Sequence, residues 1–354
     1  MKPIFEKSVR MKKFSLLVLL WLVAFACTEK ETSHNYTSVS VETVFEDSVS
    51  IRAIEFLEDN TLAFAGSKGV YGSVNTISNT ARTSVQTYDS IIPEFRAVAH
   101  TKTDFFMLSV GSPALLYKTG AGGKMELVYK EEGDGVFYDA MTFWNDQEGI
   151  AIGDFNDGCF AIIITRDGGK TWQRLPCDNL PQLDDTTGAY AASNTNIVAM
   201  DDSAWVMTSK EQLLFTGDKG RTWAAIDTPI QIQEAYQGIY SIAFYDGLKG
   251  FGIGGDFSKP ELQFSNKIST SDGGRTWSLM ADGQSPGYKS CVQYIPNSGG
   301  LDLIATGFTG ISYSKDSGAN WKPLSDEGFY TIRFLNDSIA YAAGRNRIAK
   351  LTFN

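Results

Sequence analysis

The sequence predicts an all-β protein built from repeated four-stranded units. An eight-residue pattern, Ser/Thr-x-Asp-x-Gly-x-Thr-Trp, occurs at 165–172, 216–223 and 270–277, with a weaker copy at 314–321. The Asp can accept hydrogen bonds from N–H groups of its own turn, the Gly supplies a positive φ, and the Trp can fill the space between units. We therefore expect a structural role for Asp167, Trp172, Asp218, Trp223, Asp272, Trp277, Asp316 and Trp321.

The spacing of these patterns predicts one β-propeller of seven blades. The successive Asp positions are 51, 54 and 44 residues apart, which suits blades of four strands. First strands are expected to begin near 52, 96, 139, 190, 240, 290 and 330. The seventh unit has room for only three strands, whereas the alternating run Tyr36 to Val44 belongs to no unit. We expect this run to pair with 347–353 and to close the ring. The alternative is eight blades, if 76–90 contains a degenerate strand pair.

The first 26 residues are typical of an export signal. A basic stretch precedes an apolar run of 13 residues, Phe14 to Ala26, which is too short to span a bilayer. Ala24-Phe25-Ala26 is an A-x-A cleavage site, and together with Cys27 it resembles a bacterial lipobox, although Ala24 replaces the usual Leu. We expect residues 1–26 to be removed, 27–36 to form a tether after lipidated Cys27, and 37–354 to form the propeller. The protein would then be a cell-envelope lipoprotein of the outer membrane or periplasm, with ordinary secretion as the alternative.

Composition excludes several classes of function. Removal of residues 1–26 leaves a net charge of −14, which disfavours nucleic acid as a partner. His34 and His100 are the only histidines, and C-x-x-C spacing is absent, so we expect no metal, no cofactor and no Ser-His-Asp triad. Cys159 and Cys177 flank the first complete pattern, and both a disulfide and two unpaired thiols fit this spacing. Cys291 is expected in the core.

Alternate strands reverse direction, so the starts of the first strands and the loops between second and third strands must share one face. The repeated turns lie at the other face. The ligand-binding candidates on the shared face are Arg52, Arg96, Tyr138, Asp139, Asp154, Tyr240, Asp256 and Lys289. Of these, Arg96, Asp139, Asp154 and Asp256 are expected to converge at one mouth of the channel. The acid/base candidates are Asp139, Asp154 and Asp256. A ring of salt bridges around a water-filled channel predicts the same proximity.

The repeated turns resemble the Asp boxes (BNR repeats) of sialidases and related propellers. Wider segments resemble secreted bacterial propellers, namely 137–144 with 149–154, 191–195, 238–244 with 254–257 and Pro260, and 287–290. These are described as photosystem II stability/assembly factor-like or as BNR glycosyl hydrolase-like, and some carry the label oxidoreductase. The resemblance implies a seven-bladed fold and an export signal, but no established reaction.

Sialidase activity is disfavoured by what the chain lacks. The sialidase pattern implies three arginines that bind the substrate carboxylate, but here only Arg52 and Arg96 are candidates for this role. Sialidases also carry an Arg-Ile-Pro string, and the most similar string in this chain is Arg347-Ile348-Ala349. The 252–255 run is not a G-x-G-x-x-G motif, so the oxidoreductase label has no visible basis.

We expect a non-catalytic, monomeric binding or assembly module for a protein or glycan, with membrane contact only through lipidated Cys27. The alternative is a glycoside hydrolase or lyase that uses two carboxylates of the same face.

Overall fold

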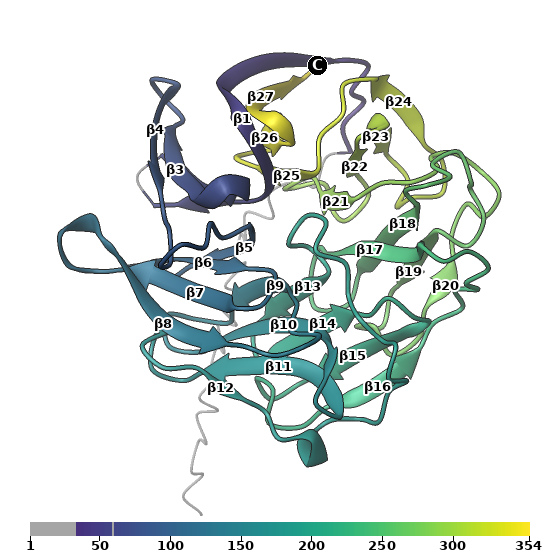
Figure 1. Cartoon of the computed structure of the whole chain (residues 1–354). Coiled ribbons are helices and arrows are strands. Elements are labelled where there is room, and N and C mark those ends of the chain that lie inside the picture. The colour runs from purple at the N-terminus through teal and green to yellow at the C-terminus, as the bar shows by residue number, and fades with distance from the viewer. Residues whose placement is uncertain (1–32, 59) are drawn as a thin grey trace, which may run out of the picture. The chain divides into compact units, whose positions relative to one another are not determined.

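The computed structural model describes residues 33–58 and 60–354 (Figure 1). Half of its residues are in strands, and the helical parts are three short 3-10 turns, η1 (Ser67–Gly69), η2 (Ala121–Gly123) and η3 (Cys177–Asn179). The described part contains no helix long and apolar enough to cross a membrane.

Five sheets are antiparallel and have four strands each. The first contains β5 (Phe95–His100), β6 (Phe105–Ser109), β7 (Ala114–Thr119) and β8 (Met125–Glu131), and the second contains β9 (Tyr138–Phe143), β10 (Gly149–Asn156), β11 (Cys159–Thr165) and β12 (Gln173–Arg174). The third contains β13 (Ile197–Met200), β14 (Ser203–Met207), β15 (Gln212–Thr216) and β16 (Ala224–Asp227). The fourth contains β17 (Gln237–Phe244), β18 (Gly250–Asp256), β19 (Lys267–Thr270) and β20 (Ser278–Leu279). The fifth contains β21 (Cys291–Tyr294), β22 (Leu303–Gly307), β23 (Gly310–Ser314) and β24 (Lys322–Ser325).

A sixth sheet has seven strands because its long strand β1 (Val39–Leu57) belongs to two groups. The first half of β1 pairs with β27 (Arg345–Phe353), which continues through β26 (Ile339–Ala343) to β25 (Thr331–Phe334). The second half of β1 pairs with β2 (Thr61–Gly66), followed by β3 (Val70–Asn75) and β4 (Thr80–Val85). The pairing predicted between 36–44 and 347–353 is confirmed by the register from Val39 opposite Phe353 to Glu46 opposite Arg347. Figure 1 shows β1 and β27 side by side.

The innermost strands contact one another in chain order. Strand β1 contacts β5, and contacts continue from β5 to β9, β13, β17, β21 and β25, which in turn contacts β1. The core lies between neighbouring sheets. Phe106 of one sheet and Ile163 of the next belong to one buried cluster, as do Trp205 and Ile268 in the sheets that follow. Each sheet is therefore buried on both faces by its neighbours.

The strand expected near residue 190 begins only at Ile197, because the preceding segment leaves the sheet. Residues 193–195 are buried and bind other sheets through short polar side chains. Asn194 donates to the Val98 carbonyl at 2.8 Å and accepts from the Met141 N–H at 2.9 Å. The Thr195 and Ser241 hydroxyls are 2.7 Å apart. Segment 190–196 is thus hydrogen-bonded to the first strands of several other sheets. The pattern of strands within its own sheet could not predict these contacts.

Candidate functional site

Each Asp box is a closed, hydrogen-bonded turn between the third and fourth strands of its sheet. In the second box, Asp218 Oδ1 accepts the N–H groups of Arg221 and Thr222, both at 2.9 Å. Asp218 Oδ2 accepts the Thr222 hydroxyl at 2.7 Å, and the Thr216 hydroxyl accepts the Gly220 N–H at 2.8 Å. Burial alone would raise the pKa of Asp218, but these donors outweigh it and lower that pKa to about 2. Equivalent bonds hold Asp167, Asp272 and Asp316.

The same turns lock neighbouring sheets together. Gly220 has a φ of 77°, and a Cβ there would lie 2.6 Å from Ile164 of the preceding sheet. Trp223 packs on the buried cluster that includes Ile164. Trp172 and Trp321 contact the aromatic rings of Phe106 and Phe251 in the preceding sheet. Trp277 contacts Phe244 of its own sheet and belongs to the buried cluster that includes Trp205 of the preceding sheet. The polar groups and the tryptophan of each box are therefore used within the fold, to close a turn and to pack against the neighbouring sheet.

A cavity of about 720 Å³ opens at the other end of the sheets. Its polar and aromatic wall consists of Arg52, Arg96, Arg345, Phe137, Tyr190, Tyr236, Tyr240, Phe257, Tyr288, Phe308 and Tyr330. Phe257 and Phe308 come from connections between second and third strands, and Arg345 is the first residue of the third strand β27. The others come from first strands or from the segments that lead into them. None of the lining residues is a carboxylate.

Three arginines make this cavity positive. The Arg52 guanidinium lies 4.2 Å from the centroid of the Tyr330 ring, and it donates a long hydrogen bond of 3.4 Å to the Ala192 carbonyl. Its buried Nε has no partner, and no carboxylate among the described residues lies within ion-pair distance. Burial, followed by the positive charge of Arg96, lowers the pKa of Arg52. Arg96 is paired with Glu94 at 2.6 Å, whereas the half-buried Arg52 and the exposed Arg345 have no ion-pair partner among the described residues.

Aromatic rings form a continuous wall beside these charges. Tyr190 and Tyr240 stack at 3.7 Å between centroids, and Tyr240 meets Tyr288 edge-on at 5.1 Å. Tyr288 in turn contacts Phe308 at 5.2 Å. Tyr236, Phe257 and Phe308 are exposed by 50%, 44% and 46%, which is unusual for rings that could pack in a core. The cavity therefore joins flat apolar surface with positive charge.

The predicted acidic candidates lie behind this wall. Asp139 is fully buried, and neither of its oxygens has a donor of good geometry among the described residues. Its nearest polar neighbours include the Asp154 carboxyl, with the charge of Arg96 nearby. Burial, reinforced by the Asp154 charge, raises the pKa of Asp139 well above its usual value, and burial also raises the pKa of Asp154. Asp154 accepts the Ala189 N–H at 3.0 Å and borders a second hollow of about 550 Å³.

Three further candidates are used within the fold. The Tyr138 hydroxyl is buried and donates to Glu131. Asp256 is 1% exposed and accepts the N–H and hydroxyl of Ser258, both at 2.7 Å, which closes its own loop. Lys289 is 3% exposed and donates to the Gly310 carbonyl at 2.8 Å, and burial lowers its pKa to about 8. Of the eight ligand-binding candidates, Arg52, Arg96 and Tyr240 line the 720 Å³ cavity.

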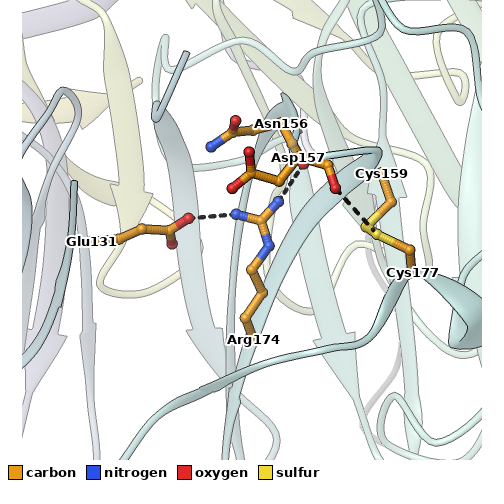
Figure 2. Close-up of a disulfide and its surroundings, with 6 residues drawn as sticks. All are labelled: Glu131, Asn156, Asp157, Cys159, Arg174 and Cys177. Atoms are coloured by element: carbon orange, nitrogen blue, oxygen red, sulfur yellow. Dashed lines mark hydrogen bonds and ion pairs between the residues drawn. A yellow bond between two sulfur atoms is a disulfide. The ribbon is translucent and has the colours of Figure 1, made fainter. Parts of the chain in front are cut away.

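A disulfide and an inter-sheet ion pair stabilise the start of the segment that reaches the cavity wall (Figure 2). Cys159 begins β11 and Cys177 begins η3, and the two sulfurs are bonded. Nearby, Arg174 pairs with Glu131 of the preceding sheet and donates to the Asn156 carbonyl at 2.6 Å. Of the two alternatives left by the spacing of the cysteines, the structure has the disulfide. Cys291 is buried in the core as predicted.

Sequence reasoning missed most of the aromatic wall. Tyr190, Tyr236, Tyr288, Phe308 and Tyr330 lie in connections that carry no repeated motif. The sequence signal that they share is an aromatic residue in the segment that leads into a first strand, or directly after a second strand. The described residues contain no group of three or more His, Cys, Asp or Glu side chains placed to hold a metal ion.

Comparison with known proteins gives a repeat match and structural matches. The BNR/Asp-box repeat model matches residues 163–174. YCF48 bound to a D1 peptide aligns with a TM-score of 0.62 and 14% identity, over 91% of this chain and 98% of that one. YCF48 from Cyanidioschyzon merolae aligns with a TM-score of 0.61 and 12% identity, over 89% and 99%. The WD40 repeats of RRP9 align with a TM-score of 0.63 and 8% identity, over 90% and 99%. No curated protein gives a significant sequence match.

Together, the repeats, the sheets and these matches define an all-β protein with Asp boxes on a propeller-like fold. The resemblance to Asp-box propellers of the photosystem II assembly factor-like kind is thereby confirmed for the repeat and the fold.

Proposed function

We propose that this protein is an exported, lipid-anchored, seven-bladed propeller that binds a protein partner in the arginine–aromatic cavity and has no catalytic activity. Five four-stranded sheets, a sixth sheet with a shared strand β1, and the cyclic contacts of innermost strands support seven blades in a closed ring. Cys27, after an A-x-A site and an apolar run, supports export and lipid attachment.

The observation that carries the binding site is the unpaired charge of Arg52. Partial burial of a guanidinium without a carboxylate partner has an unfavourable desolvation free energy, and a charge-assisted hydrogen bond to an anionic ligand would offset it. Arg96 and Arg345 border the same cavity and add to its positive potential. The partner segment is therefore expected to present an acidic side chain or a chain-terminal carboxylate.

The aromatic wall favours a peptide segment as the ligand. Exposed rings such as Tyr236, Phe257 and Phe308 offer flat apolar area at little cost in side-chain entropy. A protein partner also fits the solved relatives, since one YCF48 structure contains a D1 peptide.

The glycosidase alternative uses two carboxyl groups that face the sugar. Asp139 and Asp256 are buried, and Asp154 borders the second hollow, so none of the three lines the arginine–aromatic cavity. Binding of a protein segment is therefore the function that this geometry supports best.

A random peptide library displayed on phage tests the proposal. We expect the parent protein to enrich peptides that combine an acidic group with apolar residues, and Arg52→Gln to lose this enrichment. Arg275→Gln, in an Asp box at the other end, is the matched control and should behave like the parent. Equal enrichment by Arg52→Gln and the parent would refute the site. Hydrolysis of aryl glycosides that is lost in Asp154→Asn would instead support the glycosidase alternative.

A further inference from the structure

The end of the molecule opposite the cavity carries turns that join first and second strands. Two of these turns are bonded directly to Asp boxes. The Leu248 carbonyl accepts the N–H of Gly273 at 3.0 Å, and the Leu301 carbonyl accepts the N–H of Ser317 at 2.8 Å. The corresponding turn between β25 and β26 contains Leu335. These turns and the boxes therefore share one end, which we call the box face.

Three leucines project from equivalent turns of consecutive sheets on the box face. Leu248, Leu301 and Leu335 are exposed by 55%, 42% and 42%. The first two turns are joined, because the Lys249 ammonium donates to the Gly299 carbonyl at 2.7 Å. A single exposed leucine is ordinary, but three at matching positions on neighbouring units form an apolar rim.

The first described residues are held at this rim. The His34 N–H and Nδ1 lie 2.7 and 2.8 Å from the buried Asp302 carboxylate, next to Leu301. The Tyr36 hydroxyl donates at 2.8 Å to the carbonyl of Asp337, which lies in the turn of Leu335. Residues 33–36, the first described residues, therefore lie at the box face beside the turns of Leu301 and Leu335.

The sequence before this point indicates what covers the rim. Cys27 lies six residues before Ser33, and so few residues span roughly 20 Å at most. A lipid on Cys27 would hold the box face within that distance of a bilayer. From this we infer that Leu248, Leu301 and Leu335 dock on the lipid surface to which Cys27 tethers the chain. The inference rests on the proposed lipid anchor and is independent of the ligand in the cavity.

The charges near the rim are mixed. Lys249 and Lys315 lie on the box face, but Asp246 and Asp337 lie in the same set of turns. Docking should therefore depend on the leucines and be insensitive to salt. It would also leave the arginine–aromatic cavity facing away from the membrane, open to a partner.

The test uses the full chain, expressed in a bacterium and purified in its processed form. The protein is reconstituted with vesicles of phosphatidylethanolamine and phosphatidylglycerol at a ratio of about 3:1, which contain lipids with spin-labelled acyl chains. A bimane label is placed on Lys315→Cys at the box face or on Thr186→Cys beside the second hollow. We expect strong quenching of the first label and little of the second. The triple variant Leu248→Asp, Leu301→Asp, Leu335→Asp should lose at least about half of the quenching at position 315.

The matched control replaces three aliphatic residues exposed elsewhere, Val85, Ile91 and Ile92, with Asp, and it should keep the parent's quenching. Equal quenching in the leucine variant and the parent, or stronger quenching at position 186, would overturn the inference. The intact mass of the protein reports separately whether Cys27 is acylated. If Cys27 is not acylated, the anchor proposal fails, and sedimentation with the same vesicles then tests whether the three leucines bind lipid without an anchor. Binding of the parent that is roughly tenfold tighter than that of the leucine variant would support docking through the leucines, and equal binding would refute it.

Discussion

Replacing Asp218 with Ala should destabilise the protein without affecting the cavity. The side chain accepts two N–H groups and two hydroxyl groups of its own turn. Because the turn is partly exposed, water can replace some of these partners, so we expect a loss of about 1–3 kcal/mol rather than the full sum of four bonds. Urea unfolding followed by tryptophan fluorescence measures this loss through the midpoint at unchanged m-value.

Asp218→Asn is the control, because its amide oxygen keeps the Oδ1 contacts with Arg221 and Thr222. It should lose less than about 1 kcal/mol. Peptide enrichment should be the same for the parent and both variants at a temperature where all are folded. A loss below about 0.5 kcal/mol for the Ala variant would show that the carboxylate does not hold the turn. A binding defect in a fully folded variant would contradict the structural role of the box.

Three other perturbations follow from the structure. Lys267 and Lys289 are buried without a carboxylate at ion-pair distance among the described residues, and burial lowers both pKa values to about 8. Between pH 8 and 10 the unfolded chain binds more protons at these lysines than the folded protein does, so the free energy of unfolding should rise with pH. We expect a rise on the order of 1–2 kcal/mol per lysine, measured by urea unfolding. In Lys267→Met, the part of this rise that is due to Lys267 should be absent. Deletion of residues 33–46 should expose the edge of β27 and cause aggregation, measured by light scattering; a monomeric variant would disprove this role. Gly274→Ala places a Cβ 2.8 Å from Trp205 at a φ of 78°, so thermal unfolding should show a lower midpoint than for Gly122→Ala, which has a similar φ but open space.

The local chemistry of the repeats could be predicted from the sequence because each box closes within about eight residues. Asp, Thr and Gly at fixed offsets define the turn wherever it lies, and the Trp must pack on the neighbouring unit. The pairing of the N-terminal strand with β27 could also be predicted from the sequence, because the last repeat has only three strands and the run at 36–44 belongs to no other repeat. The disulfide was one of two outcomes allowed by the positions of its cysteines.

The tertiary structure alone decided which polar residues are free to act. Asp256 and Lys289 sit at the predicted end of the molecule, but they bind nearby loop groups, because a buried charge must find local partners. Asp139 faces Asp154 and loses its exposure, since both lie behind segment 190–196, whose departure from its sheet depends on contacts with distant strands. The residues that line the cavity come from positions 52 to 345, and only the packing of the sheets against one another brings them together. Sequence spacing specifies bonds within a turn, whereas convergence across the molecule depends on how all the sheets pack at once.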